Sequence, residues 1–177
     1  MLIQELARQE SLDVLASMQL GRLACAQGMQ PYIVPFYFAY QNNCLYSFSL
    51  PGQKIDWMRA NPSVCVEADH MRREEWSTVV VFGRYLELSD TAEMRSERAL
   101  ALELLQQRAE WWEPGSVRMT QGGTPPALVP IFFRINIVQI TGRRATVEPG
   151  APDTSQSTAD SAKSGWLHKL VRGVRRR

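Results

Sequence analysis

A run of hydroxyl, glycine and lysine residues in the first third of the chain has the composition of a phosphate-binding turn. Ser47 and Ser49 end an apolar stretch, a Pro-Gly break follows, and Gln53 and Lys54 begin a segment with helical character. Hydroxyls, backbone amides and a cation that converge at the start of a helix supply the donors and the dipole that a phosphate requires. An ordinary strand–turn–helix with one surface lysine has the same composition, so the spacing alone leaves both interpretations open.

A second group of polar residues stands at the start of another apolar stretch. Trp76, Ser77 and Thr78 precede a β-branched run that ends in Gly83 and Arg84. Periodicity alone favours a core strand with solvent-facing polar ends.

The cysteine and histidine residues give little indication of a metal site or of a catalytic group. Cys25, Cys44 and Cys65 form no CxxC pair and have no suitably spaced histidine, so we predict buried thiols and no metal site. His70 is the only histidine before the C-terminal tail, and it follows Asp69. We expect its ring to be solvated rather than catalytic.

The elements that must position these residues are mostly strands. A tight turn is expected at Gln41-Asn42-Asn43, because Asn tolerates positive φ, and Pro35 predicts a bulge or an interruption of its strand. Strands in hairpin order, without a G-x-G-x-x-G or Walker-type loop, indicate a mainly β protein with an antiparallel barrel. Apolar and β-branched runs predict six strands, at 22–26, 32–40, 44–49, 64–68, 78–88 and 128–140. Helical spacing predicts three helices, within 1–20, at 53–60 and at 90–111.

Composition divides the chain into a folded domain at 1–147, a linker at 148–162 and a basic tail at 163–177. The linker is rich in Pro, Ser, Thr, Asp and Ala, which cannot bury enough surface to fold. The tail holds six basic residues and no acid, which leaves 14 basic and 18 acidic residues in the rest of the chain. A mildly acidic domain is not expected to bind nucleic acid specifically.

The tail has one apolar helical face. Trp166, Leu170 and Val174 recur at a spacing of four among Lys and Arg residues, a pattern suited to an anionic membrane surface or an acidic partner. A frayed, solvated basic tail is the alternative, because the segment has only a few turns. The N-terminus has no signal-peptide pattern and no run approaches the ~20 apolar residues of a membrane span, so we expect a cytoplasmic protein.

The order of these segments resembles the FMN-binding split-barrel family related to pyridoxamine 5′-phosphate oxidase, and within it the nitroimidazole-resistance (nitroreductase-like) branch. The resemblance covers about residues 5–145 and implies a six-stranded antiparallel split β-barrel with a few peripheral helices. It also implies a homodimer with FMN in grooves at the interface. The matching segments are 21–24, 31–35, 52–62, 76–84 and 140–143.

Cofactor-binding residues follow from the same resemblance. The segment that ends in Lys54 would contact the FMN phosphate, the strand around Pro35 would lie along the isoalloxazine, and the segment that begins at Trp76 would line the groove. Arg22 is a weaker candidate, since it could equally be a surface ion-pair partner. Trp111 or Trp112 would reach the partner's flavin or belong to the core. The assigned residues are Lys54, Gln53, Ser47, Phe48, Ser49, Val34, Pro35, Phe36, Tyr37, Trp76, Ser77 and Thr78.

One departure from the family separates cofactor binding from catalysis. Many members of the nitroimidazole branch have a histidine near the position of Phe48, which cannot transfer protons. The first hypothesis is therefore an FMN-dependent oxidoreductase acting on a small organic substrate, with its catalytic residues unassigned. The alternative is a non-catalytic flavin carrier or sensor. Heme binding on the same barrel is disfavoured, because only His70 could be an axial ligand; a deazaflavin in place of FMN stays open.

Overall fold

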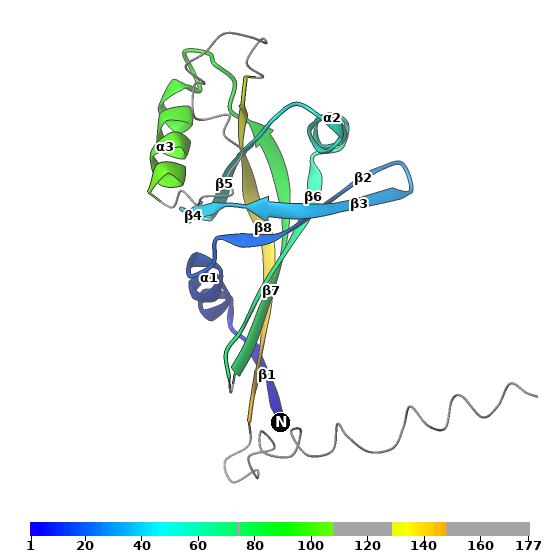
Figure 1. Ribbon diagram of the computed structural model, residues 1–177, viewed down its shortest axis with the longest axis vertical. Helices are drawn as coiled ribbons and strands as arrows, with labels where there is room; N and C mark the ends of the chain where they lie inside the picture. Colours follow the sequence, from blue (N-terminus) through cyan, green and yellow to red (C-terminus); the bar gives the residue numbers. More distant parts are fainter. Residues whose placement is uncertain (74, 108–128, 148–177) are drawn as a thin grey trace, which may run out of the picture. The chain divides into compact units, whose positions relative to one another are not determined.

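A computed structural model describes residues 1–73, 75–107 and 129–147. The expected mainly β, antiparallel architecture with peripheral helices is confirmed, although the described residues form eight strands rather than six. The sheet order is β3-β2-β6-β7-β8-β5-β4, and β1 pairs with β8 (Figure 1). The elements are β1 (Leu2–Leu6), α1 (Arg8–Ala16), β2 (Leu20–Gln27), β3 (Gln30–Tyr37), β4 (Ala39–Gln41), β5 (Cys44–Ser49), α2 (Gln53–Ala60), β6 (Ser63–Met71), β7 (Glu75–Glu87), α3 (Arg95–Gln106) and β8 (Ile131–Thr146).

The two ends of this sheet meet at Phe38. The chain passes from β3 directly into β4, which pairs with β5, so the single residue Phe38 joins the two ends of the sheet. The Phe38 amide donates to the Gln19 carbonyl, and the Ser47 hydroxyl donates to the Tyr37 carbonyl at 2.7 Å. Between β3 and β5 the described residues form no strand ladder, so the barrel is split at this point.

Two apolar clusters stabilise the domain. Alternate residues of the strands face one side, as a period of two requires, and enclose the main core, which also receives side chains from α1 and α2. A second cluster fills the space between α3 and the opposite face of β4, β5 and β8. The fully buried side chains of the main core include Leu15, Leu23, Phe38, Leu45, Ile55, Met58, Val66, Val79, Val81, Phe133 and Ile135.

Two expected helices have different limits in the structure. The N-terminal segment begins with β1, and α1 starts only after Ala7, whose amide donates to the Glu10 carboxylate at 2.7 Å. Pairing with β8 defines β1, with Leu6 opposite Gly142, and the helical spacing of the early sequence gives no sign of it. The third helix begins at Arg95 rather than at 90, because residues 91–94 form turns.

The long strand expected at 32–40 is interrupted at Phe38, and the interruption expected at Pro35 is wrong. Arg22 lies opposite Pro35 in an unbroken β2–β3 ladder. Every second residue pair of the β2–β3 ladder is hydrogen-bonded, starting with Gln27 and Gln30 at the turn. The alternation continues as far as the hydrogen bond from the Phe38 amide to the Gln19 carbonyl. This alternation aims the nitrogens of Pro31 and Pro35 toward the open edge, where no ladder N–H is required.

The hairpin turn at Asn42 and Asn43 is confirmed, with φ values of 51° and 60°. No helix within the described ranges is both long and apolar enough to cross a membrane. The expected linker and basic tail lie outside the described residues, as do Trp111 and Trp112.

Candidate functional site

The most unusual charge of the barrel is Lys54, the only lysine in residues 1–147. It lies in the first turn of α2 and is half-buried. Burial lowers the pKa of Lys54, and the nearby Cys25 thiol offsets part of this shift. The residues that the structure describes give its ammonium no hydrogen bond or ion pair. A half-buried cation without an acidic partner is suited to an anionic ligand.

The position of Lys54 is fixed by contacts on the other faces of α2. Ile55 and Met58 are fully buried in the main core. Near the last turn, the Arg59 guanidinium donates to both carboxylate oxygens of Glu87 at 2.7 and 2.8 Å. The Asn61 side-chain amide then donates to the Ala26 carbonyl of β2 at 3.2 Å. The helix is therefore anchored to β2, β7 and the core, and these contacts fix the position of Lys54 in its first turn.

Aromatic residues that the sequence did not point to lie in the same region. Trp57 follows Lys54 by three residues, a spacing that places the two on neighbouring parts of a helix surface. Its ring contacts Tyr32 edge to face, with centroids 5.5 Å apart. Tyr32 lies opposite Cys25 in the β2–β3 ladder. Helical spacing from Lys54 is the signal that could have identified Trp57.

The predicted hydroxyls of β5 face the barrel interior but are engaged with the backbone. Ser47 is 3% exposed and Ser49 is 8% exposed. Ser47 donates to the Tyr37 carbonyl, and Ser49 donates to the Leu50 carbonyl at 2.9 Å. These bonds stabilise the end of β5, and the predicted phosphate contacts of both hydroxyls stay predictions. Gln53 is exposed beside Lys54 at the start of α2.

Phe48 lies on the opposite face of β5 from Ser47 and Ser49. It packs against the second cluster, where its ring is 5.8 Å from that of Phe132. The Arg98 guanidinium of α3 covers the Phe132 ring at 4.8 Å. The structure therefore places Phe48 beneath α3, away from the side on which Lys54 and the two serines lie.

The four predicted residues of β3 alternate between its two faces. Val34 and Phe36 belong to the main core, whereas Pro35 is exposed and Tyr37 packs against the cluster under α3. The backbone of β3 is more accessible than these side chains, because β3 is an edge strand. Between its two prolines, the Ile33 amide is the donor that points to this edge.

The segment at Trp76 lies at the far end of the sheet from Lys54. The nine residues of β6 start just after α2 and span roughly 26 Å at ~3.3 Å per residue. Met71, the last residue of β6, lies opposite Trp76, and the end of β6 that joins β7 lies far from α2 (Figure 1). Ser77 is fully buried on the inner face and donates to Glu75 at 3.1 Å, whereas Trp76 and Thr78 lie on the outer face. One chain therefore does not bring Trp76 to Lys54.

Two further expectations are resolved by the contacts of β2 and β6. Arg22 binds Glu67 at 3.0 Å and Asp69 at 2.8 Å, which confirms the alternative of a surface ion pair. The expectation of a solvated His70 ring is wrong. Both of its ring nitrogens are inaccessible and have no hydrogen-bond partner among the described residues. The register of β6 places the His70 side chain on the inner face of this strand, which α1 covers.

Known proteins resemble this chain over nearly the whole described domain. Residues 7–144 match the family model of pyridoxamine 5′-phosphate oxidase. An uncharacterised protein of Rhizobium meliloti strain 1021 is 43% identical over 146 residues, which are 82% of this chain and 97% of that protein. The solved structure of a FAD-binding protein from Mesorhizobium loti is 43% identical, with a TM-score of 0.71, and covers 82% of this chain and 100% of its own. The FAD-binding protein from Mycobacterium smegmatis is 28% identical, with a TM-score of 0.57, and covers 81% of this chain and 98% of its own.

Proposed function

Because the chain belongs to the pyridoxamine 5′-phosphate oxidase family, we propose that it binds a flavin nucleotide with a phosphate group on Lys54. The observation that carries this proposal is the half-buried ammonium that has no acidic partner among the described residues. A phosphate would supply the missing counter-charge and accept charge-assisted hydrogen bonds. The edge of β3 would offer the Ile33 amide and neighbouring carbonyls to a planar ring in the split.

The identity of the flavin is a finer part of the proposal. The sequence led us to expect FMN, whereas the similar proteins from Mesorhizobium loti and Mycobacterium smegmatis are FAD-binding proteins. Both nucleotides carry a phosphate on the ribityl chain, so an anchor at Lys54 suits either. Titration with each flavin distinguishes the two.

We also propose a homodimer that completes the flavin site. Trp76 lies too far from Lys54 to share a ligand within one chain, but a second copy can bring its own Trp76 to this site. The outer face of the sheet offers an apolar surface for such pairing. Its central row is defined by the strand register and by a bulge at Val138, and consists of Ile33, Ala24, Cys65, Phe82 and Val138. A continuous row of exposed or partly exposed apolar residues on one face of a sheet is typical of an interaction site.

The homodimer is tested by light scattering on two matched variants. Ile33 is 62% exposed in the apolar row, and Met29 is fully exposed in the adjacent β2–β3 turn. We expect Ile33→Asp to give a monomer and Met29→Asp to leave the mass unchanged. A wild-type monomer, or an unchanged mass for Ile33→Asp, would argue against this interface.

The reaction that we propose is oxidoreduction of a small organic substrate. A bound flavin supplies the hydride or electron transfer, and the residues described above would bind it and exclude water from it. The competing function, a flavin carrier or sensor, predicts a different response to NADH and NADPH. Stopped-flow bleaching of the bound flavin faster than that of free flavin supports the enzyme; reduction no faster than that of the free cofactor favours the carrier.

The phosphate anchor is tested by flavin titration of the purified protein. Lys54→Met keeps the length of the side chain and removes its charge, whereas Lys54→Arg keeps the charge. We expect Lys54→Met to weaken flavin binding at least tenfold, because a hydrogen bond to a charged group typically contributes ~1.5–3 kcal/mol. Lys54→Arg should retain most of the affinity. Equal affinity in the wild type and Lys54→Met would remove Lys54 from the site, and no flavin uptake by the wild type would overturn the proposal.

A further inference from the structure

The amine of Lys54 is accessible to a reagent in solution, although the side chain is half-buried. Among the described residues, none of the inaccessible side-chain nitrogen and oxygen atoms without a hydrogen-bond partner belongs to Lys54. These residues also provide no hydrogen bond or ion pair to its Nζ atom, so Nζ is in contact with solvent. An accessible lysine nitrogen is a nucleophile once it has lost its proton.

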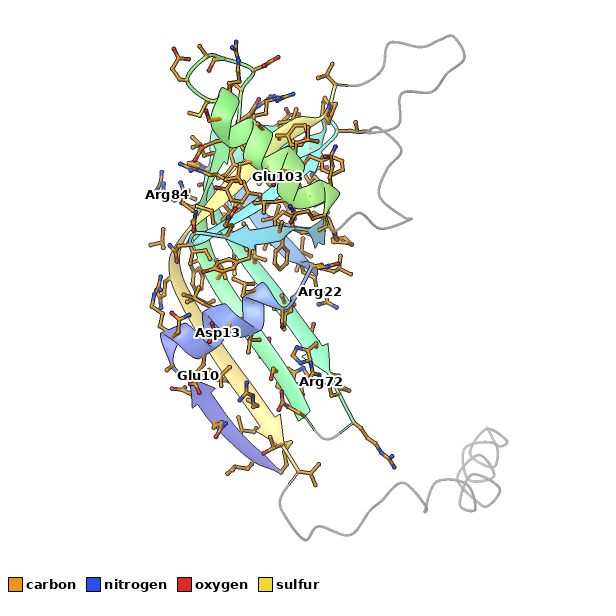
Figure 2. All side chains as sticks on the ribbon, turned by 90° about the vertical axis from the view of Figure 1, so that its left-hand side faces the viewer. Glu10, Asp13, Arg22, Arg72, Arg84 and Glu103 are labelled. Atoms are coloured by element: carbon orange, nitrogen blue, oxygen red, sulfur yellow. The ribbon has the colours of Figure 1, made fainter. Side chains whose placement is uncertain are left out.

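The carboxylates of the described residues are engaged or placed elsewhere. Asp56, the acid of α2 itself, lies 3.8 Å from the Arg59 guanidinium in the next turn. Glu10 and Asp13 lie on α1 (Figure 2). Because none of these acids forms an ion pair with Lys54, the fold does not hold the proton on its nitrogen.

Two features of α2 disfavour the protonated form of this amine. Lys54 occupies the first turn, where the helix dipole repels a cation. Burial of the side chain lowers the pKa of Lys54. A larger fraction of the amine is therefore uncharged near neutral pH, and the uncharged form is the one that attacks carbonyl carbons.

The thiol near Lys54 does not compete for such a reagent. Cys25 is 4% exposed. Burial raises the pKa of the Cys25 thiol, and Lys54 offsets only part of this shift. Since a cysteine reacts as the thiolate, a buried and protonated thiol is unreactive. An electrophile in solution therefore reaches Lys54 rather than Cys25.

The start of α2 favours an electrophile that carries a phosphate group. Gly52 is the N-cap of this helix, and a Cβ atom added there would meet no other atom within 4 Å, so the approach to the first turn is open. The free amides and the dipole of a helix N-terminus attract phosphate groups. An acyl phosphate combines such a group with an activated carbonyl carbon, the target of an uncharged amine.

We propose that Lys54 is a site of acylation by small acyl phosphates, and that acylation and flavin binding exclude each other. The Lys54 nitrogen forms a bond to the acyl carbon, and the bond from this carbon to the phosphate oxygen breaks. The departing phosphate takes the proton that the nitrogen loses. The product is an uncharged amide, which cannot supply the counter-charge of a flavin phosphate. The exclusion rests on the proposed flavin site, whereas the acylation does not.

Competitive labelling of the flavin-free, full-length protein tests the acylation. Acetyl phosphate is the probe, and free Nα-acetyl-lysine in the same solution is the standard. Peptide mass spectrometry separates Lys54 from Lys163 and Lys169, the two other lysines of the chain. Near neutral pH we expect Lys54 to react at least threefold faster than the standard, because more of its amine is uncharged. A rate equal to or below that of the standard would overturn the acylation.

Flavin titration of the acetylated protein tests the exclusion. Lys54→Arg is the matched control, because arginine keeps the charge and is not acetylated, while Lys163 and Lys169 react in both proteins. We expect acetylation to weaken flavin binding at least tenfold in the wild type, as for Lys54→Met, and less than twofold in Lys54→Arg. Bound flavin should slow the acetylation of Lys54 alone. An equal loss of affinity in both proteins would assign the effect to the tail and overturn the exclusion.

Failure of the acylation and failure of the proposed function give different results. If the wild type binds flavin but Lys54 reacts no faster than the standard, the acylation is overturned and the proposed function stands. If flavin binds without protecting Lys54, the phosphate lies elsewhere and the exclusion is overturned. If the wild type binds no flavin, the proposed function and the exclusion fail together, and the labelling rate alone decides whether Lys54 is an acylation site.

Discussion

The two ends of α2 carry cations in opposite situations. Lys54, in the first turn, is half-buried and has no acidic partner among the described residues. Arg59, in the last turn, is 47% exposed at its side chain and makes two hydrogen bonds to Glu87, whose carboxylate also accepts the Tyr85 hydroxyl at 3.0 Å. Burial lowers the pKa of Lys54, whereas the hydrogen bond to Glu87 raises that of Arg59.

The helix dipole strengthens this contrast. A cation near the C-terminus of a helix is stabilised by the dipole, and a cation near the N-terminus is destabilised. Arg59 therefore has both an acidic partner and a favourable position in the helix dipole. Lys54 violates two local rules of stability, because it is a half-buried charge without an acidic partner among the described residues and it lies at the unfavourable end of the dipole. Violations of this kind occur at functional sites, where a ligand supplies what the fold does not. The difference shows that Arg59 serves the fold and supports our proposal that Lys54 serves a ligand.

The largest effect on stability is expected from Glu87→Gln, which removes the charge that binds Arg59. We expect the free energy of unfolding to fall by about 1–2 kcal/mol, because the ion pair between Arg59 and Glu87 is bidentate but partly exposed. Glu5→Gln is the control: Glu5 is 84% exposed at its side chain and lies 3.8 Å from Arg143, so its loss should be close to zero. Urea unfolding measures both, and equal values for the two variants would contradict a structural role for Glu87.

Lys54→Met should have the opposite sign in the flavin-free protein. Removing a half-buried, unpartnered charge from the first turn of α2 should raise the free energy of unfolding by about 0.5–1 kcal/mol, the usual size of a stabilising single substitution. Lys54→Arg should give no such gain, because it keeps the charge. A loss of stability in Lys54→Met would show that Lys54 contributes to the fold, and the contrast with Arg59 would disappear.

Short-range signals in the sequence were sufficient for some elements and insufficient for others. The strand at 44–49 and the helix at 53–60 have the predicted limits, because the Asn-Asn turn, the Pro-Gly break and Asn61-Pro62 bound them locally. β1 was missed because only its pairing with β8, some 140 residues away in the chain, makes it a strand. Pro35 was misjudged because its tolerance depends on β3 being an edge strand, which no local pattern reveals.

The candidate site was only partly accessible from the sequence. Neighbouring residues of a strand face opposite sides, so Ser47 and Phe48 could not both point toward Lys54, and this follows from their numbers alone. The separation of Trp76 from Lys54 depends on the length and direction of β6, which required the sheet topology. The bulge between β7 and β8 falls at Gly83, and a glycine inside a predicted strand is the local signal that could have indicated it.

The smallest effect concerns pH, and it separates the two ends of α2 in one measurement. The hydrogen bond from Arg59 lowers the pKa of Glu87 below its ordinary value of 4.5. The stability from this pair is therefore complete above pH 4.5 and is lost as the pH falls through the lowered pKa. Lys54 acts at the other end of the scale, because its pKa in the fold lies below the ordinary value of 10.5. Between the lowered pKa of Lys54 in the fold and its ordinary value in the unfolded chain, the unfolded chain binds more protons than the folded one. Stability therefore rises with pH in this range, because the cost of the buried charge disappears.

Urea unfolding of the flavin-free protein across both pH ranges tests this assignment by difference. Subtracting the profile of Lys54→Met from that of the wild type should leave an alkaline rise and a flat acid range. Subtracting Glu87→Gln should leave the acid loss and, in the alkaline range, only the contribution of Tyr85, whose pKa Glu87 raises. The differences remove the cysteines and tyrosines that the substitutions do not affect, whereas Cys25, whose pKa Lys54 lowers, and Tyr85, whose pKa Glu87 raises, each stay in one of them. An alkaline rise that persists in Lys54→Met would mean that another group carries the buried charge, and the proposed anchor for the phosphate would lose its electrostatic basis.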